Sequence, residues 1–250
     1  MSRGIRLIVR ADDFGMCHAV NDGIRRAYED GIATMASAMA PCPWFTEAMT
    51  IAKRTGIPLG AHQTLTCEWD FFRWRPLTDG RSLTGPDGTF YRNVAEARAH
   101  VTHEDAVSEL LAQVGRFRDA GLFPDYLDHH MGPALPSAYP EVSERTHVPF
   151  LYSGRIHLDS LNELTPREAG EKKSWLLGLL TSLRPGLHML VCHPGVGGPE
   201  LASLTSPQSE PWPWAEKWRV ADLEVLTDPE VRDVINDTGI TLCSLGQALN

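Results

Sequence analysis

The sequence predicts a single α/β domain built around a mostly parallel sheet. Short apolar runs alternate with longer amphipathic runs along the chain, which is the pattern of repeated β/α units. The length of 250 residues suits either one α/β barrel or two small domains, and a composition that is 42% hydrophobic favours one globular unit. No internal repeat or low-complexity segment divides the chain. We therefore expect one domain over residues 1–250.

Seven short apolar runs predict the strands of this sheet. They lie at 6–11, 33–40, 58–64, 124–129, 149–152, 188–193 and 240–244. Longer amphipathic runs between the strands predict six helices. These lie at 19–30, 44–55, 104–120, 166–183, 215–226 and 229–238.

Start and stop signals support several of these helices. Thr165 is expected to cap the helix at 166–183, with Pro166 at the first helical position and Glu168 completing a capping box. The TDPE segment at Thr227 repeats this pattern, and THED at Thr102 is a weaker version with Asp in place of Glu. Glycines stand where four of the runs should stop, at Gly31, Gly56, Gly121 and Gly239.

Charge, cysteine content and hydropathy exclude several classes of protein. The chain has 23 basic and 32 acidic residues, and no block of Lys and Arg that could follow a phosphate backbone, so nucleic acid is not an expected partner. Five cysteines without a C-x-x-C pair predict reduced thiols rather than disulfides or a thiolate zinc site. No apolar stretch approaches the roughly 18 residues that span a bilayer. We expect a soluble, cytoplasmic protein that is not bound to a membrane.

Polar residues collect where the expected strands end. In parallel β/α folds these ends and the loops after them form one face, which carries the active site. An Asp and two His would suffice to bind a divalent metal ion, and a spare carboxylate and a spare imidazole could serve as general base and acid. The candidates are Asp12, Asp13, His62, Asp128, His129, His130 and His193.

Two adjacent aspartates at the end of an apolar strand are the most unusual feature. Neighbours on a regular strand face opposite ways, so the backbone must break at or just after Asp13 if Asp12 is to serve the same site, and Gly15 is best able to permit that turn. Taken alone, such a pair more often makes a turn or a cap, and a single His at a strand end is more often structural. The coincidence of four segments favours a functional site.

Five segments carry a resemblance to a known family. They are LIVRADDFGMCHAVNDGI, GAHQTLTCEWDFFRWRPL, PDYLDHHMG, LVCHPG and KWRVADLEVLTDPEVRDVINDTGI. In this order, and over nearly the whole chain, they resemble the YdjC-like carbohydrate deacetylases, which include chitooligosaccharide (diacetylchitobiose) deacetylases. The resemblance implies a distorted, TIM-barrel-like (β/α) barrel that binds one divalent metal ion. It also implies a hydrolase that removes an N-acetyl group from an amino sugar or oligosaccharide.

The same resemblance implies a role for each matched residue. Asp13, His62 and His130 correspond to the metal ligands. Asp12 corresponds to the general base, and His193 is the candidate general acid that protonates the leaving amine. These three ligands suit Mg, Zn, Mn or Co, so the metal stays open.

Two features near the end of the strand at 124–129 bear on the predicted site. Because strand neighbours point to opposite faces, only one of His129 and His130 should reach the metal, and the pattern favours His130. Many relatives continue Asp-x-His into a further histidine, where this chain has Met131 and Gly132. That difference bears on the choice of sugar more than on the reaction.

Two long segments, 65–101 and 197–214, are rich in Trp, Pro, Gly and Asp, and loops of this length usually carry function or form lids. Aromatic faces suit the apolar face of a pyranose ring, and arginines can hydrogen-bond its hydroxyls, although these side chains could equally pack the loop onto the barrel. The expected substrate-binding residues are Trp69, Phe72, Arg73 and Trp74, together with Arg219 in the matched C-terminal segment.

Three alternatives remain beside the deacetylase. A metal-dependent amidohydrolase acting on another substrate commonly draws a His-x-His pair from its first strand, which this chain lacks. A glycosidase needs two carboxylates on opposite sides of the scissile bond, whereas Asp12 and Asp13 are adjacent. A non-catalytic sugar- or metal-binding protein would be favoured by loss of the base or acid, but both are present. A homo-oligomer is plausible on base rates alone.

Overall fold

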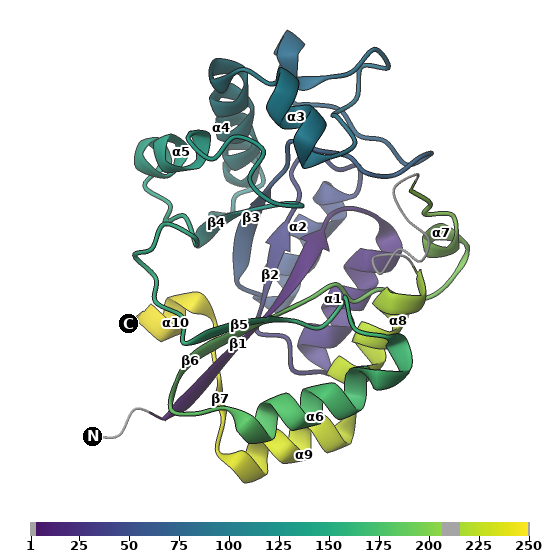
Figure 1. Ribbon diagram of the computed structural model, residues 1–250, viewed down its shortest axis with the longest axis vertical. Coiled ribbons are helices and arrows are strands. Elements are labelled where there is room, and N and C mark those ends of the chain that lie inside the picture. The colour runs from purple at the N-terminus through teal and green to yellow at the C-terminus, as the bar shows by residue number, and fades with distance from the viewer. Residues whose placement is uncertain (1–3, 207–215, 250) are drawn as a thin grey trace.

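Seven parallel strands form a strongly curved sheet at the centre of the protein (Figure 1), which we describe from a computed structural model over residues 4–206 and 216–249. The strands are β1 (Ile5–Phe14), β2 (Met35–Ala38), β3 (Leu59–Gln63), β4 (Tyr126–His129), β5 (Ser160–Glu163), β6 (Gly186–Cys192) and β7 (Thr241–Leu242). Their order is β4-β3-β2-β1-β6-β5, and β7 pairs with the start of β1. The sheet is thus a half-barrel, which confirms the predicted α/β class and its distorted barrel.

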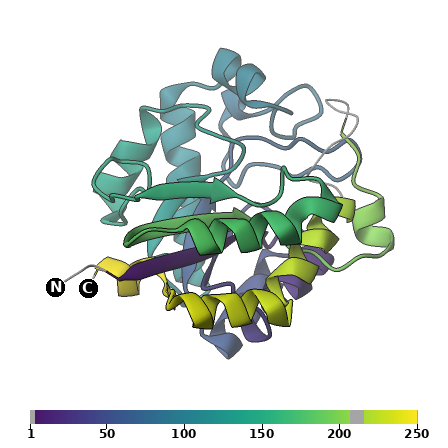
Figure 2. The same cartoon turned by 60° about the horizontal axis from the view of Figure 1, so that its bottom comes forward.

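Most of the helices lie on the outer face of the half-barrel, and the C-terminal one packs Leu245 and Ala248 against the apolar interior. The helices are α1 (His18–Glu29), α2 (Phe45–Thr55), α3 (Val94–His100), α4 (His103–Asp119), α5 (Ala138–Thr146), α6 (Lys172–Ser182), α7 (Pro199–Ala202), α8 (Glu216–Leu226), α9 (Pro229–Thr238) and α10 (Leu245–Leu249). Figures 1 and 2 show α6 and α9 side by side along one flank, and α4 beside α5 at the other end. No helix in the described ranges is long and apolar enough to cross a bilayer.

Strand alternation separates an apolar outer layer from a partly polar interior. On β1, Leu7 and Val9 belong to the large core beneath the helices, whereas Ile8 packs inside the half-barrel with residues such as Tyr126. Arg10 and Asp12 continue the inward-facing set of Ile8 along β1. The interior is therefore apolar where the strands begin and charged where they end, which places the polar groups at one rim.

Six of the seven predicted strands are confirmed, and one is wrong. Residues 149–152 contribute only an isolated bridge from Phe150 to Leu127, and the strand between α5 and α6 is β5 instead. The sequence of β5, SLNE, alternates between half-buried and exposed residues, so it lacks the apolar run that marks the other strands. An edge strand covered on one side only carries this weaker signal.

Helix boundaries reveal three further differences. The helix predicted from Pro166 begins at Lys172, and Thr165 caps no helix because its hydroxyl is engaged in the interior. Asp228, rather than Thr227, caps α9 by accepting from the Glu230 amide, while Thr102 caps α4 as predicted.

The expected long loop at 65–101 contains more structure than predicted. It includes α3 and a 3₁₀ turn at Arg81–Leu83, and it is anchored to α4 by the buried carboxylate of Glu109, which accepts from the Leu77 and Thr78 amides. The second predicted loop contains the short helix α7. Residues 207–215 lie outside the described residues, and they include the first residue of the helix predicted at 215–226.

Candidate metal centre and active site

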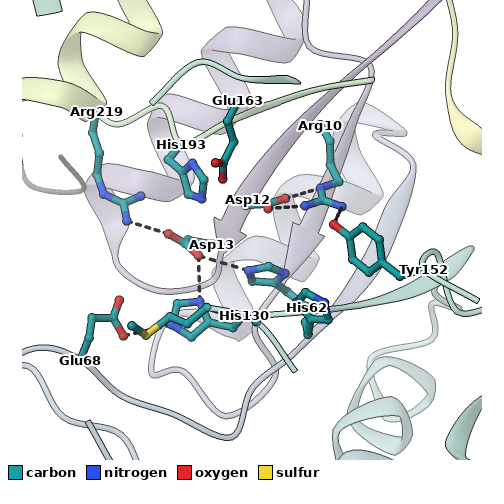
Figure 3. A pocket seen from close by; sticks show the side chains of 13 residues that line it. Arg10, Asp12, Asp13, His62, Glu68, His130, Tyr152, Glu163, His193 and Arg219 are labelled. Carbon is teal, nitrogen blue, oxygen red and sulfur yellow. Dashed lines mark hydrogen bonds and ion pairs between the residues drawn. The ribbon is translucent and has the colours of Figure 1, made fainter. Parts of the chain in front are cut away.

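A cavity of about 400 Å³ opens at the carboxyl ends of the strands (Figure 3). Side chains from the ends of β1, β3 and β4 and from the residue after β6 converge there, as the sequence predicted, and β5 adds a further side chain that it did not predict. The lining residues are Arg10, Asp12, Asp13, His62, Glu68, His129, His130, Met131, Gly132, Tyr152, Glu163, His193 and Arg219. All five residues that were predicted as ligands, base and acid are in this set.

A break in β1 lets both aspartates face the cavity. The pairing of β1 with β2 shifts register between Ala11 and Phe14, which is a bulge at Asp12 and Asp13. Asp13 adopts a left-handed backbone with φ of 71°, a conformation that Asp tolerates better than most residues, and Gly15 follows with φ of 94°. The predicted break therefore occurs, and Asp13 itself makes the first part of the turn.

The nitrogen atoms of two buried histidines point toward one oxygen of Asp13. Oδ1 of Asp13 lies 3.5 Å from Nε2 of His62 and 3.4 Å from Nδ1 of His130. This oxygen is buried, and no well-directed hydrogen bond reaches it from the described part of the chain. Ligand bonds of about 2.0–2.2 Å around a tetrahedral ion place the ligand atoms roughly 3.4 Å apart. The three residues thus have the donor types and the spacing to hold one divalent ion.

The other ring nitrogen of each histidine is held by a carboxylate. Nδ1 of His62 lies 2.9 Å from Oδ1 of Asp128, and Nε2 of His130 lies 3.0 Å from Oε2 of Glu68. Such carboxylate–histidine pairs orient metal-binding imidazoles and fix which nitrogen is free to bind. Burial alone would lower the pKa of His130, but Glu68 and Asp13 together outweigh it and the pKa rises to about 9.

Arg219 on α8 holds the second oxygen of Asp13. Its Nη2 donates to Oδ2 at 2.6 Å, and both side chains are almost fully buried. Burial would raise the pKa of Asp13, but the guanidinium together with His130 and His62 outweighs that effect and keeps the pKa well below its ordinary value. Asp13 therefore stays ionised, as a ligand must, and Arg219 orients it.

Arg10 holds both oxygens of Asp12. Its Nε and Nη2 each donate to one oxygen of Asp12 at 2.7 Å, and its Nη1 lies 3.0 Å from Oδ2 of Asp128 and 3.1 Å from the hydroxyl of Tyr152. Asp12, His62 and Asp128 also have ligand atoms within 4.8 Å of one another. However, the guanidinium already forms ion pairs with both of these carboxylates, so the cluster around Asp13 is the better candidate for a metal site.

His193 lies across the cavity from His62 and His130 (Figure 3). Its Nδ1 is 2.8 Å from the hydroxyl of Thr165, and its backbone amide donates to Asp222 at 2.8 Å. Burial lowers the pKa of His193 to about 3, so the ring is neutral near pH 7.

The structure separates the two neighbouring histidines as the alternation of strand residues predicts. His130 joins the cluster around Asp13, whereas the ring of His129 stacks on Tyr152 at a centroid distance of 4.7 Å. His129 thus lines the cavity without belonging to that cluster.

The four aromatic and arginine residues predicted to bind substrate do not line the cavity. Trp69 is fully buried, Phe72 packs edge-on to Trp74 at 6.0 Å, and Arg73 donates to Thr89 and to the Phe90 carbonyl within the same loop. Trp74 also contacts the ring of His130 at 6.1 Å. In this geometry they build the loop that supports the site, and their contact with a sugar stays a prediction. Arg219 does line the cavity, as an ion-pair partner of Asp13.

Four lining residues were missed by the sequence reasoning, namely Arg10, Glu68, Tyr152 and Glu163. Tyr152 ends a run that was predicted as a strand, but it was not named as a site residue. Arg10 could have been found, since it lies two residues before Asp12 and must share its face on a regular strand. Glu68 follows no strand, and Glu163 ends the strand that was not predicted. Figure 3 shows the carboxylate of Glu163 pointing into the cavity beside His193.

Together, the half-barrel and the buried Asp-His-His cluster define an α/β protein with a candidate single-metal site at its carboxyl rim. The model of the YdjC-like protein family matches residues 6–237, and the chain therefore belongs to this family.

Named relatives match over almost the whole chain. A carbohydrate deacetylase of Geobacillus stearothermophilus is 32% identical over 246 residues, which cover 94% of each protein. A chitooligosaccharide deacetylase of Yersinia enterocolitica is 30% identical over 261 residues, covering 95% of this chain and 97% of the relative. These matches confirm the family resemblance drawn from the motifs.

Solved structures support the fold. A protein of Enterococcus faecalis aligns with a TM-score of 0.82 at 24% identity, covering 98% of this chain and 99% of its own. A family 4 carbohydrate esterase from Streptomyces lividans aligns with a TM-score of 0.51 at 10% identity, over 98% and 93% of the two chains. The half-barrel architecture is thus shared with proteins of very different sequence.

Proposed function

We propose that this chain is a metal-dependent carbohydrate deacetylase, which hydrolyses the N-acetyl amide of an amino sugar or oligosaccharide to acetate and a free amine. The observation that carries the proposal is the convergence of Asp13, His62 and His130 on one point, with Asp12 and His193 on the same cavity. The names of the relatives support the substrate class and the C–N bond as the target.

Asp13, His62 and His130 would hold the ion, which we expect to be Zn²⁺, Mn²⁺, Co²⁺ or Mg²⁺. When bound, such an ion supplies a Lewis acid for the acetyl carbonyl and lowers the pKa of water. Glu68 and Asp128 keep the two imidazoles oriented with the correct nitrogen toward the ion.

Asp12 is the proposed general base. Arg10 engages both of its oxygens, and each carboxylate oxygen retains a further lone pair, which can accept a proton from the attacking water. The guanidinium fixes the direction of that lone pair, because it binds the carboxylate through two parallel hydrogen bonds. General base catalysis of this kind contributes about 10²- to 10⁴-fold to the rate.

His193 is the proposed general acid. Its Nδ1 is hydrogen-bonded to Thr165, so Nε2 is the nitrogen that would take up a proton and pass it to the departing sugar nitrogen. Protonation is needed because an amide nitrogen is a poor leaving group as an anion. Asp12 and His193 thus act on the two sides of the scissile amide, one on water and one on the amine.

The substrate also contacts the outer part of the cavity. Tyr152 and His129 form a stacked aromatic surface there, which suits the apolar face of a pyranose ring, and Glu163 offers a carboxylate to hydroxyl groups. We expect a cytoplasmic location, which the five free and buried cysteines support, and the predicted homo-oligomer stays a prediction.

The test is acetate release from N-acetylglucosamine, diacetylchitobiose and longer N-acetylated oligosaccharides. We expect release that a chelator abolishes and that one of the four metals restores, and we expect Asp13→Asn to lose both metal and activity. Asp22→Asn on the surface of α1 is the matched control and should retain both. No release from any sugar despite bound metal would overturn the proposal in favour of a sugar- or metal-binding protein. Release of another amide's product alone would indicate an amidohydrolase with a different substrate.

A further inference from the structure

A buried chain of polar groups lies behind His193, on the side away from the metal ligands. Thr165, Asp222 and Lys172 are all fully buried. The hydroxyl of Thr165 lies 2.8 Å from Nδ1 of His193 and donates to Oδ2 of Asp222 at 2.5 Å. Lys172 donates to the other oxygen of Asp222 and, at 2.8 Å, to the carbonyl of Trp218.

The directions of these hydrogen bonds can be assigned from their partners. Three donors converge on Asp222, namely the Lys172 ammonium, the Thr165 hydroxyl and the backbone amide of His193. Although burial raises the pKa of Asp222, these three donors hold its carboxylate in the form that only accepts. Thr165 spends its one hydrogen on Asp222, so its oxygen must accept from His193. The proton of the neutral imidazole therefore lies on Nδ1, and Nε2 carries the lone pair.

We propose that Thr165 and Asp222 are positioning residues that hold His193 in its Nδ1–H tautomer and stabilise the imidazolium from which Nε2 donates a proton. The proposal rests on the proposed deacetylase function. As the C–N bond breaks, its electron pair stays on nitrogen, and that nitrogen takes the proton from Nε2. Nε2 carries the lone pair in the resting ring, so it first takes up this proton from solvent, and Asp12 returns the proton of the attacking water to solvent. The ring therefore ends each turnover neutral, with its Nδ1 proton still shared with Thr165.

Stability alone gives no reason for this buried network. Taking the charges of Lys172 and Asp222 out of water costs several kcal/mol, and an apolar pair of similar volume is often as stable or more stable. A network that fixes one tautomer and places a negative charge two hydrogen bonds from the imidazole gives these residues a function instead.

Helix α8 links this network to the metal ligands. Arg219 and Asp222 are three residues apart and so lie on one face of the helix, where Arg219 holds Asp13 and Asp222 holds Thr165 and the His193 backbone. Lys172, at the start of α6, ties that helix to α8 through Asp222 and Trp218. One rigid element therefore orients both the proposed ligand and the proposed acid.

The kinetic test compares Thr165→Val, which removes the hydroxyl at nearly constant shape, with Thr165→Ser, which keeps it. We expect kcat to fall about 10- to 100-fold in Thr165→Val, a part of the 10²- to 10⁴-fold that general acids contribute, with KM and metal content unchanged. Thr165→Ser should recover most of kcat. Thr66→Val is the matched control, since this buried hydroxyl has no hydrogen-bond partner among the described residues and its loss should leave kcat unchanged.

The tautomer itself can be read by ¹⁵N NMR of histidine-labelled protein loaded with a diamagnetic ion such as Zn²⁺ or Mg²⁺. The His193 signals are identified by their absence in His193→Gln. We expect the Nδ1–H pattern in the wild type, and a mixture of tautomers or a shift to Nε2–H in folded Thr165→Val. An Nε2–H pattern in the wild type would overturn the inference even if Thr165→Val failed to fold, and so would an unchanged kcat in folded Thr165→Val.

Failure of the proposed function gives a different result. If the wild type releases no acetate from any sugar, both the deacetylase function and the proton-donating role of His193 are wrong. If the wild type releases acetate but lacks the Nδ1–H pattern, the deacetylase stands and only the positioning role of Thr165 and Asp222 is wrong.

Discussion

Replacing Glu68 by Gln tests the carboxylate that holds His130. The substitution keeps the size of the side chain and an oxygen that can accept from Nε2, but it removes the negative charge 3.0 Å from the imidazole. In the metal-free protein, burial lowers the pKa of His130, but Glu68 and Asp13 together outweigh it and raise the pKa from 6.5 to about 9. The pair therefore stabilises the folded state while His130 is protonated.

The magnitude follows from the size of this shift. At 1.36 kcal/mol per pKa unit, a rise from 6.5 to about 9 corresponds to about 3 kcal/mol of folding free energy. Because the folded pKa lies above the unfolded one, this stabilisation is fully present below pH 6.5 and is lost as the pH rises through 9. Asp13 supplies part of it, so we expect Glu68→Gln to cost about 2 kcal/mol at low pH and much less at high pH.

Urea denaturation of chelator-treated protein at about pH 6 and about pH 10 measures this difference, and the gap between wild type and Glu68→Gln should shrink with pH. Glu141→Gln is the control, because Glu141 makes a similar 2.8 Å pair with His103 on the surface, where solvent leaves such pairs little energy. A gap for Glu68→Gln that is equal at both pH values would refute the assignment of the His130 proton to this pair.

Three further substitutions separate the roles of the cavity residues. Asp12→Asn should lower kcat by at least 10²-fold with metal content retained, and near-normal turnover would exclude Asp12 as the base. Asp128→Asn should weaken metal binding about 10- to 100-fold, because His62 loses its orienting partner. Competition with a chelating dye measures the affinity, and an unchanged affinity would contradict that role of Asp128. Glu163→Gln should raise kcat/KM for a phosphorylated N-acetyl sugar about tenfold relative to kcat/KM for the neutral sugar, because it removes a negative charge that repels the phosphate. If the ratio of the two kcat/KM values does not change, Glu163 does not contact the substrate.

The sequence was most informative where acidic residues and histidines lie at the ends of predicted strands. Asp12, Asp13, His62, His130 and His193 could be predicted because each follows an apolar run, and parallel strands bring such ends to one rim. The break in β1 was also foreseeable, because two neighbours on a strand cannot otherwise face one cavity. These predictions rest on local pattern and on the geometry of parallel sheets.

Other parts depend on contacts between distant segments. The capping box at Thr165 is a genuine local signal, yet Thr165 bonds Asp222 and His193 instead, because a buried hydroxyl forms the hydrogen bonds that its surroundings offer. Glu68 reaches His130 across 62 residues of chain, and no periodicity reveals such a pair. Strand β5 was not predicted because half of its residues are polar, as suits a strand at the edge of the sheet.

The guanidinium of Arg10 binds both Asp12 and Asp128, and this affects how many metal ions the site can hold. Those carboxylates and His62 could otherwise form a second metal position beside the first. A guanidinium carries a permanent charge, and no chelator can remove it and no other ion can exchange with it. If the cluster around Asp13 holds one ion, as we propose, the protein supplies the second positive charge from its own chain and needs only one metal ion. A single codon, at Arg10, would then separate a mononuclear centre from a binuclear one.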